Sequence, residues 1–262
     1  MSMVSKETIL IREDNNGICN LILNRPSAHN ALSFKLLSSI KDEINMIKED
    51  KRIRVLIISA NGPSFCSGHD LKEINSNKNK NDYDKLFNLC SEVMLSLLKL
   101  NIPVIAKIHS TATAAGCQLV ATCDLAIAST NAKFATPGVN IGLFCSTPMV
   151  ALSRNISNKH SMEMLITGDL IDAQTAQNFG LINKVVSPEK LNKAVMEIAN
   201  KILKKSYTTI ATGKKAFYHQ LELGISKAYD FTSEVMAENM IEYNAQEGVE
   251  AFLQKRSPIW KD

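Results

Sequence analysis

Two stretches of the sequence place small residues where a ligand can approach the backbone. Residues 112–128 read ATAAGCQLVATCDLAIA, and the small residues lead into a run with helical periodicity. Unpaired N–H groups and the positive dipole end at a helix start favour an anion or a developing oxyanion. Residues 65–74 read FCSGHDLKEI, where Gly68 permits a tight turn. Either stretch alone is more often close packing or a plain turn than a site.

The side chains near these stretches that could carry protons or attack a substrate are few. Gln118 follows the small residues, and its amide cannot exchange a proton near neutral pH as a glutamate would. His69 has a suitable unperturbed pKa, and its side chain fits two orientations, into the site or away from it. Cys117 and Cys145 have no sequence neighbour that would lower the pKa of the thiol, so inert buried thiols are the commoner interpretation.

The composition is that of a globular chain with an ample core. The 262 residues are 45% hydrophobic and 21% charged, and the net charge of +4 comes from dispersed lysines. This pattern disfavours nucleic-acid binding and suits an anionic small molecule. Six cysteines without CxxC spacing predict reduced thiols inside a cell, and no zinc site.

The beginning of the chain shows no targeting pattern, and no apolar run of about 18 residues occurs. We therefore expect a cytoplasmic protein without a membrane span, with the mitochondrial matrix as the alternative if the start belongs to a processed form.

The elements expected to position the two stretches alternate between strands and helices. Residues 8–12 and 18–23 predict a hairpin around Asn15, Asn16 and Gly17. Ser33 is a candidate N-cap for a helix whose apolar residues recur at helical spacing up to Ile47, and residues 54–59 form a buried strand.

The chain beyond residue 60 first predicts a polar segment and then, after Pro188, mainly helices. Residues 75–84 are polar and predict a solvated loop, followed by a helix at 85–100. The last part of the chain carries helical periodicity in three segments, 190–204, 208–223 and 225–252. We therefore expect a sheet-containing core at 1–189 and a helical region at 190–262.

Six stretches in this order resemble the crotonase (enoyl-CoA hydratase/isomerase) family over nearly the whole chain. They are LNRPSAHNALS at 23–33, FCSGHDLKE at 65–73, IPVIAKIHSTATAAGCQLVATCDLAIAS at 102–129, FATPGVNIGLF at 134–144, TGDLIDAQTAQNFGLINKVV at 167–186 and AFLQKRSPIW at 251–260. The stretches SGHDLKE, ATAAGCQLVA and FATPGVNIGLFCSTP are most similar to one group within the family.

The resemblance implies an α/β fold, a crotonase-like β-β-α superhelical spiral at 1–189 that carries an acyl-CoA site. It also implies a C-terminal helical trimerisation region at 190–262, which makes a homotrimer or a dimer of trimers. The oxyanion of an acyl-CoA thioester would lie between the backbone amides of His69 and Ala115. No metal is implied, and coenzyme A enters as part of the substrate rather than as a separate cofactor.

Further substrate contacts follow from the resemblance. The segment of the chain that contacts coenzyme A in the family corresponds to His69, Asp70, Leu71 and Lys72. Near the C-terminus, Phe252 and Lys255 match positions that reach the adenine and phosphate, sometimes from a neighbouring subunit. An equally good interpretation is that Phe252 is a helix-packing aromatic residue and that Lys255 is a surface lysine.

The sequence departs from the family at both catalytic glutamates. Gln118 stands at the first position and Gly138 at the second, and the further acid of dienoyl isomerases is replaced by Ser146. Between Glu92 and Glu163 the only acidic residue is Asp124, for which a structural role is expected. The usual two-carboxylate hydration mechanism is therefore missing.

The expected function is an acyl-CoA-binding lyase or isomerase of fatty-acid metabolism that stabilises a thioester enolate without the two glutamates. One alternative is an acyl-CoA binder without turnover. Another is decarboxylation of an α-carboxyacyl-CoA, because loss of CO₂ itself generates the enolate. The hydroxyls of Ser146 and Thr147 suit a substrate carboxylate or a water molecule.

Overall fold

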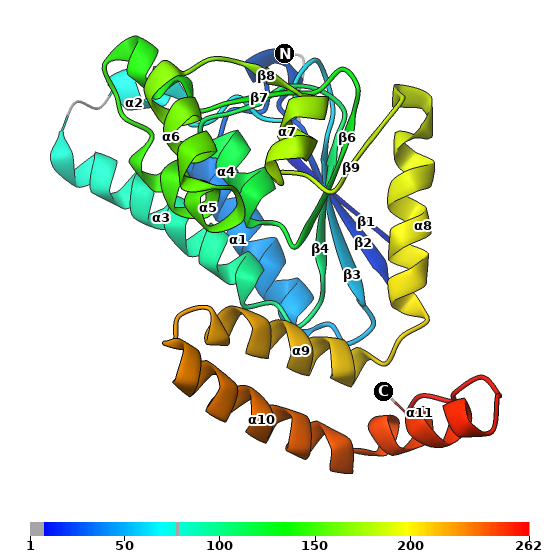
Figure 1. The fold of residues 1–262 in the computed structure, drawn as a ribbon. Coiled ribbons are helices and arrows are strands. Elements are labelled where there is room, and N and C mark those ends of the chain that lie inside the picture. The colour runs from blue at the N-terminus through cyan, green and yellow to red at the C-terminus, as the bar shows by residue number, and fades with distance from the viewer. Residues whose placement is uncertain (1–7, 77–78, 262) are drawn as a thin grey trace.

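A six-stranded sheet forms the centre of the computed structural model, which describes residues 8–76 and 79–261 (Figure 1). Its strand order is β1-β2-β3-β4-β6-β9, with β1 antiparallel to β2 and the other neighbours parallel. The strands are β1 (Leu10–Asn15), β2 (Ile18–Leu23), β3 (Val55–Ala60), β4 (Val104–Ile108), β6 (Leu125–Ser129) and β9 (Lys184–Val186). A smaller sheet contains β5 (Ala112–Thr113), β7 (Lys133–Ala135) and β8 (Ile171–Asp172).

The first hairpin confirms the turn predicted from the sequence. Asn15 pairs with Ile18, so Asn16 and Gly17 form a two-residue loop with φ of 48° and 81°. Positive φ at both positions is what a type I′ turn requires, and asparagine and glycine adopt it readily. Because the ladder continues up to this tight turn, β1 extends to Asn15 rather than ending at residue 12 as predicted.

Helices cover both faces of the large sheet (Figure 1). On one face, α8 (Leu191–Leu203) buries Leu191 and Val195 against Ile57 and Ile127. The other face packs against α1 (Phe34–Glu49), α3 (Lys80–Leu98) and α4 (Ala115–Thr122). Burial on both faces explains why the run in β3 is continuously apolar.

Helix α1 begins where the sequence predicts. The Ser33 hydroxyl accepts a hydrogen bond from the Leu36 amide at 3.2 Å, which satisfies one free N–H of the first turn. The apolar side chains at helical spacing, from Leu36 to Ile47, are all buried. This fixes the segment just before α1, where Leu32 forms a β-bridge with His69.

The polar segment predicted as a loop is wrong over residues 80–84. These residues form the first turns of α3, because the Asn79 carboxamide oxygen caps the amide of Asp82 at 2.9 Å. Lys80 and Asp84 add an ion pair of 2.6 Å one turn apart. Residues 75–76 belong to α2 (Leu71–Ser76), and residues 77–78 lie outside the described residues.

The C-terminal helices lie together at one end of the molecule (Figure 1). They are α9 (Tyr207–Gln220), α10 (Ile225–Ile241) and α11 (Tyr243–Leu253). The single helix predicted at 225–252 is wrong, because the chain is extended at Glu242, with ψ of 146°. The buried Asn244 explains the break, since its side chain bonds to the Ser206 hydroxyl and the Lys261 amide.

The remaining helical elements connect the sheets to these helices. They are η1 (Pro26–Ala28), η2 (Pro137–Ile141), α5 (Ser146–Asn155), α6 (Asn158–Thr167), α7 (Ala173–Phe179) and η3 (Pro188–Lys190). Helix α8 begins just after the predicted boundary at residue 190 and packs on the sheet. The division into 1–189 and 190–262 stays a prediction.

A buried polar cluster attaches α9 to the core. The Lys214 ammonium lies 2.6 Å from the Asp124 carboxylate and donates to the carbonyls of Leu97 and Ile102. The Tyr218 hydroxyl donates to the other oxygen of Asp124 at 2.7 Å. Asp124 therefore has a structural role, as the sequence indicates.

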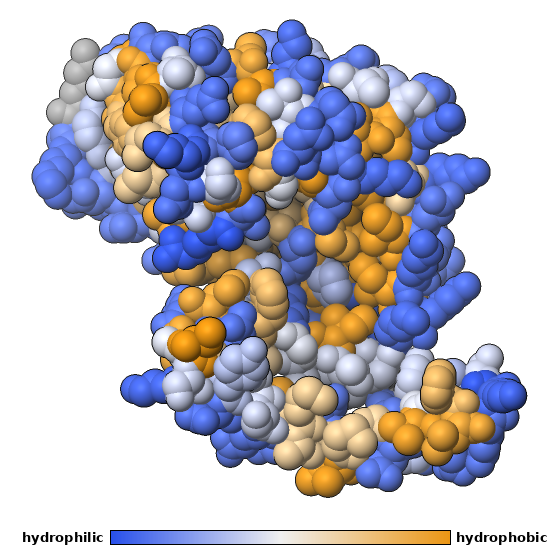
Figure 2. Space-filling view, viewed as in Figure 1, coloured by the Kyte–Doolittle hydropathy of each residue, from blue (hydrophilic) through white to orange (hydrophobic). Residues whose placement is uncertain are grey.

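The surface of α10 and α11 carries exposed apolar side chains, part of which Figure 2 shows. They include Ile225, Tyr229, Met236, Ile241, Phe252 and Leu253. Of the helices in the described part of the chain, none combines the length and the hydropathy needed to cross a membrane.

Candidate active site

The two stretches singled out in the sequence lie side by side. The Thr113 amide donates to the Cys66 carbonyl at 2.9 Å, and Cys66 forms a β-bridge with Ala112. At the start of α4, a Cβ on Gly116 would lie 2.2 Å from the Cys66 carbonyl oxygen. Only glycine allows this approach, so Gly116 lets α4 press against the first stretch.

Gly68 brings His69 next to Ala115. Its φ is +96°, and an added Cβ would lie 2.8 Å from the Ala114 Cβ and 3.3 Å from the Ala115 nitrogen. The turn is held from the other side by Leu32, whose amide donates to the Gly68 carbonyl at 2.7 Å. Glycine is therefore needed at position 68 for both conformation and space.

The amides of His69 and Ala115 are both available to a ligand. Neither donates to another described residue, and Ala115 opens α4, where N–H groups have no partner within the helix. Ala114 precedes it with φ of 49° and ψ of −120°, an uncommon backbone conformation for a residue with a side chain. The resemblance predicts an oxyanion hole at these two amides, and that role stays a prediction.

A cavity of about 390 Å³ opens in front of these amides. Its wall is formed by Ser67, His69, Leu71, Ile74, Phe87, Ala114, Ala115, Pro137, Gly138, Asn140, Ile141, Leu143, Phe144, Cys145, Ser146, Thr147 and Pro148. The wall is mostly apolar, as expected for a site that binds an acyl chain. None of the described residues that form it carries a carboxylate.

Gly138, which the resemblance matches to the second glutamate position, lies in the cavity wall with no room for a side chain. A Cβ there would lie 2.1 Å from the Leu143 carbonyl oxygen and 2.9 Å from the Cys145 sulfur. The chain folds back over Gly138, since the Leu143 amide donates to the Gly138 carbonyl at 2.9 Å. The backbone itself therefore occupies the space that a larger residue would need.

Gln118, which the resemblance matches to the first glutamate position, is not one of the described residues that line the cavity. Its side chain is buried in α4, and its carboxamide oxygen lacks a hydrogen-bond partner among the described residues. The backbone amide of Gln118 closes the first turn of α4 by donating to the Ala114 carbonyl at 3.0 Å. The structure thus does not bring the Gln118 side chain into the wall beside Gly138.

Both cysteines considered as nucleophiles are buried thiols. Burial raises the pKa of Cys117 to about 12 and raises that of Cys145 as well. Cys145 lines the cavity and Cys117 does not. Because a thiol reacts as its thiolate, neither residue is activated at neutral pH.

His69 is one of the residues that line the cavity, and both nitrogens of its ring are shielded from solvent. Burial is the main reason why the pKa of His69 falls to about 4, and the Leu32 backbone acts in the opposite direction. The ring is therefore neutral at pH 7. The Phe87 ring of α3 meets it edge to face at 5.2 Å. Phe87 was not predicted as a site residue, because helical periodicity is its only signal in the sequence.

The other predicted contacts on α2 differ from one another. Leu71 lines the cavity. Asp70 instead pairs with Arg25 at 2.9 Å and accepts hydrogen bonds from the amides of Lys72 and Glu73, so it holds the start of the helix. The Lys72 side chain is exposed, as a contact with a phosphate requires.

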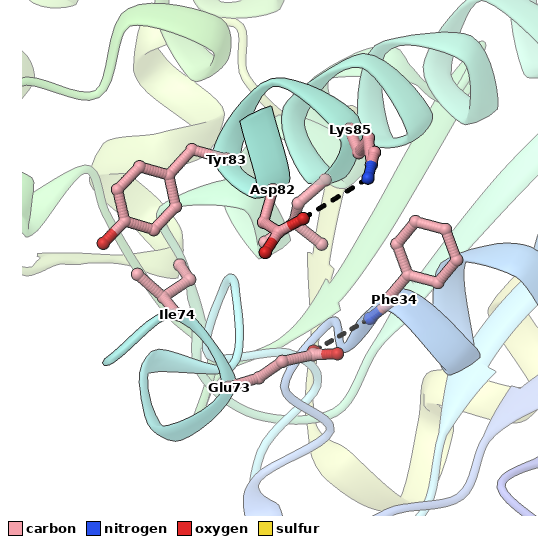
Figure 3. Close-up of a pocket in the computed structure, with 7 residues that line it drawn as sticks. Phe34, Glu73, Ile74, Asp82, Tyr83 and Lys85 are labelled. Atoms are coloured by element: carbon pink, nitrogen blue, oxygen red, sulfur yellow. Dashed lines mark hydrogen bonds and ion pairs between the residues drawn. The ribbon is translucent and has the colours of Figure 1, made fainter. Parts of the chain in front are cut away.

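Helix α2 is also tied to α1 next to a second hollow of about 210 Å³ (Figure 3). The Glu73 carboxylate accepts a hydrogen bond from the Phe34 amide at 2.9 Å. Across the hollow, Asp82 pairs with Lys85 at 3.4 Å. Ile74 belongs to the walls of both spaces, so this tie stabilises the side of the cavity that carries His69.

Phe252 and Lys255 are not brought to the cavity within one chain. Helix α11 lies at the opposite end of the molecule from α2 (Figure 1). Phe252 is 82% exposed, and Lys255 follows the helix with φ of 55°. The predicted contact of these residues with coenzyme A therefore depends on a neighbouring subunit and stays a prediction.

Comparison with known proteins gives concordant matches. The family model described as enoyl-CoA hydratase/isomerase matches residues 13–262. Enoyl-CoA hydratase domain-containing protein 3 of Rattus norvegicus is 47% identical over 245 residues, which is 94% of this chain and 82% of the rat protein. This is the group to which SGHDLKE and the two other stretches are most similar, so that prediction is confirmed.

Solved structures share the whole fold. The crystal structure of an enoyl-CoA hydratase from Mycobacterium smegmatis superposes with a TM-score of 0.95 at 46% identity, covering 97% of this chain and 99% of the other. Human enoyl-CoA hydratase domain-containing protein 3 gives 0.94 at 45% identity, covering 97% and 100%. The predicted α/β fold with a helical C-terminal region is thereby confirmed.

The prediction of a cytoplasmic location is wrong by the same comparison. The rat relative is named as a mitochondrial protein. The prediction depended on the residues at the beginning of the chain, and residues 1–7 lie outside the described structure.

The family model, the identity of the relatives and the shared fold agree with the pair of amides beside the cavity. The chain belongs to the enoyl-CoA hydratase/isomerase family.

Proposed function

We propose that the chain binds an acyl-CoA thioester and stabilises its enolate between the amides of His69 and Ala115. The thioester carbonyl oxygen would accept both N–H groups, and the acyl chain would occupy the apolar cavity. Coenzyme A then enters as part of the substrate, with the exposed Lys72 as a point charge for a phosphate group. The reaction class is that of a crotonase-type lyase or isomerase in fatty-acid metabolism.

The observation that carries this proposal is the pair of free amides at a cavity whose described wall residues include no carboxylate. Backbone donors that are fixed before the reaction stabilise an oxyanion regardless of the side chains, and loss of one oxyanion-hole donor costs ~3 kcal/mol in other enzymes with such holes. The proton chemistry of the two family glutamates is missing here. The proposal is therefore enolate stabilisation without the hydratase acid and base.

Ligand-induced stabilisation tests the binding step. Butyryl-CoA at 100 times its dissociation constant is expected to stabilise the fold by about 2.7 kcal/mol, which is visible as a shift in the melting temperature. Coenzyme A alone is the matched control and should give a smaller shift, because it leaves the acyl cavity and the two amides unused. No shift with acyl-CoA esters of several chain lengths would exclude the proposal.

Decarboxylation of an α-carboxyacyl-CoA is a second candidate, favoured by neutral hydrogen-bonding groups in the cavity wall. Asn140, Ser146 and Thr147 lie there, and no acid among the described wall residues would repel a substrate carboxylate. The C–C bond to the carboxylate breaks, CO₂ leaves, and its electron pair forms the enolate. CO₂ release from malonyl-CoA or methylmalonyl-CoA supports this candidate, and release at the background rate excludes it.

The setting that we propose is mitochondrial, on the strength of the relatives named so. A homotrimer or a dimer of trimers is proposed as the assembly, with the exposed apolar side chains of α10 and α11 in its interfaces. Binding without turnover remains the outcome if thioesters stabilise the fold and no reaction follows.

A further inference from the structure

The apolar cavity and the second hollow meet at one side chain of α2. Ile74 lines the cavity of about 390 Å³ and also the hollow of about 210 Å³. No other residue in the described part of the chain lines both spaces. Figure 3 shows Ile74 at the hollow, on the same helix as Glu73 and across from Tyr83 of α3. The Ile74 side chain therefore separates the two spaces.

Helix α2 holds Ile74 firmly in this position. The Ile74 amide donates to the Asp70 carbonyl at 3.0 Å, and the Asp70 carboxylate pairs with Arg25 at 2.9 Å. The neighbouring Glu73 carboxylate accepts from the Phe34 amide of α1 at 2.9 Å. The Ile74 side chain also packs against the hydrophobic core. Because α2 is tied to two other segments, the wall at Ile74 is fixed before a ligand binds.

Apolar surface leads from the two amides of the site to Ile74. The Phe87 ring contacts the His69 ring at 5.2 Å, and Phe87 and Ile74 both line the cavity. These two side chains are partly buried, whereas Leu71 and Ile141 of the same wall are 53% and 61% exposed. The exposed residues therefore mark the mouth of the cavity, and Phe87 and Ile74 mark its inner part. An acyl tail that leaves solvent extends toward Ile74, because burial of apolar surface is favourable.

The surroundings change in character beyond Ile74. The described residues that line the cavity include no charged side chain, whereas the hollow is lined by Glu73, Asp82 and Lys85. Glu73 already binds the Phe34 amide, and Asp82 pairs with Lys85 at 3.4 Å. An apolar tail in the hollow would take water away from these charged groups, which costs free energy. Both the space and the apolar surroundings for an acyl tail therefore end at Ile74.

We propose that Ile74 determines the longest acyl chain that the cavity accepts. The substrate class is then an acyl-CoA with an uncharged acyl chain that is short enough to end at this side chain. The inference rests on the proposed function and adds chain-length selection to it.

The inference predicts how affinity depends on the length of the acyl chain. Burial of one methylene group stabilises a complex by about 0.8 kcal/mol, which is about 4-fold in Kd. The affinity of the wild-type chain should rise by this factor with each added carbon until the tail reaches Ile74. It should then stop rising or fall, because a longer tail must bend back or enter the charged hollow. We call the acyl length at which the rise stops the chain-length limit.

Titration calorimetry with the straight-chain series from butyryl-CoA to decanoyl-CoA measures this limit. Ile74→Ala is expected to move the limit to a longer chain, because alanine lacks the carbons beyond Cβ and joins the cavity to the hollow. Ile74→Phe is expected to move it to a shorter chain, because the larger ring extends into the cavity. A general loss of stability would not shift the limit in opposite directions.

The matched control is Tyr83→Ala, which enlarges the hollow and leaves the cavity wall unchanged, since Tyr83 lines only the hollow. Its chain-length limit should equal that of wild type. The melting temperature of each variant without ligand shows whether it is folded. Ile74→Val removes less of the side chain and should move the limit in the same direction as alanine, so it takes the place of an alanine variant that does not fold.

The outcomes separate this inference from the proposed function. If the variants at Ile74 bind acyl-CoA with the limit of wild type, Ile74 does not select chain length, although thioester binding stands. A limit that moves as far in Tyr83→Ala as in Ile74→Ala overturns the inference as well, since the hollow would already accept the tail. Wild-type affinity that is independent of chain length also overturns it. If no acyl-CoA binds, the proposed function and the inference both fail.

Discussion

At the residue scale, the backbone around Gly138 leaves no space for the side chain that the resemblance predicts at this position. The Leu143 carbonyl lies where the first carbon of any side chain at position 138 would be, at 2.1 Å. A glutamate would have to displace the segment that contributes Leu143 and Cys145 to the cavity wall. Substitution of Gly138 by glutamate therefore would not restore a hydratase.

Gly138→Ala tests this close packing. Overpacking of a tight site costs about 1–3 kcal/mol, and we expect a loss of this size in the free energy of unfolding, measured by urea denaturation. Gly213→Ala on α9 is the matched control, since nothing lies within 4 Å of its added Cβ. The control should be neutral or stabilising by up to about 1 kcal/mol. Equal stability of Gly138→Ala and wild type would contradict the structure here.

At the scale of the elements, the position of α9 depends on one buried lysine. The Lys214 side chain is only 7% exposed and donates to Asp124 and two backbone carbonyls. Removal of one partner of such a cluster leaves the remaining charge buried without a compensating charge, which destabilises the folded state.

Lys214→Met is therefore expected to destabilise the chain by about 3 kcal/mol or more, measured by chemical denaturation. The methionine keeps most of the aliphatic length, so the loss reports on the charge and its hydrogen bonds. Lys215→Met, at the next and exposed position, should stay within about 0.5 kcal/mol of wild type. A loss no larger than that of the control would mean that the cluster contributes nothing.

The end of α11 is fixed by an ion pair with a defined pH dependence. Glu247 accepts two hydrogen bonds from Arg256 and one from the Ile259 amide. The hydrogen bond from Arg256 is the main reason why the pKa of Glu247 falls from 4.5 to about 2. A carboxylate with a lowered pKa in the folded state stabilises that state above its unfolded pKa.

The stability that Glu247 contributes should therefore be complete above pH 4.5 and disappear as the pH falls toward 2. Glu247→Gln should be less stable than wild type at pH 7, and this difference should shrink over that interval in denaturation experiments. Glu238→Gln, at an exposed position on α10, is the control and should show no such convergence. A difference that does not change with pH would rule out the ion pair as its source.

At the scale of the whole molecule, the exposed apolar surface of α10 and α11 predicts an assembly. Ile225 and Ile241 are each 79% exposed, and Phe252 is 82% exposed. Light scattering after size exclusion should give three or six times the chain mass of 28.9 kDa. A single species with the mass of one chain at micromolar concentration would contradict the predicted trimer.

Local rules predicted the parts of the fold where neighbours in sequence decide the structure. The turn at Asn16 and Gly17 and the cap at Ser33 are examples, because each needs only its own backbone and the next few residues. The break at Glu242 was not predictable in this way. It depends on hydrogen bonds between Asn244 and residues such as Ser206, which lie far away in sequence.

The candidate site shows the same division. The approach of His69 to Ala115 was predicted from motifs, since the glycines and small residues allow it. The contact of the His69 ring with Phe87 and the position of Gln118 outside the cavity wall were not, because the packing of α3 and the phase of α4 decide them.

We propose an acyl-CoA site that keeps its oxyanion hole and lacks the hydratase acid and base. Hydration of crotonyl-CoA, followed by loss of the enoyl absorbance with a two-glutamate family hydratase in parallel, tests it most directly. We predict that crotonyl-CoA raises the melting temperature while its hydration is slower by about 100-fold or more than in the reference enzyme. Hydration at the rate of the reference enzyme would contradict the account.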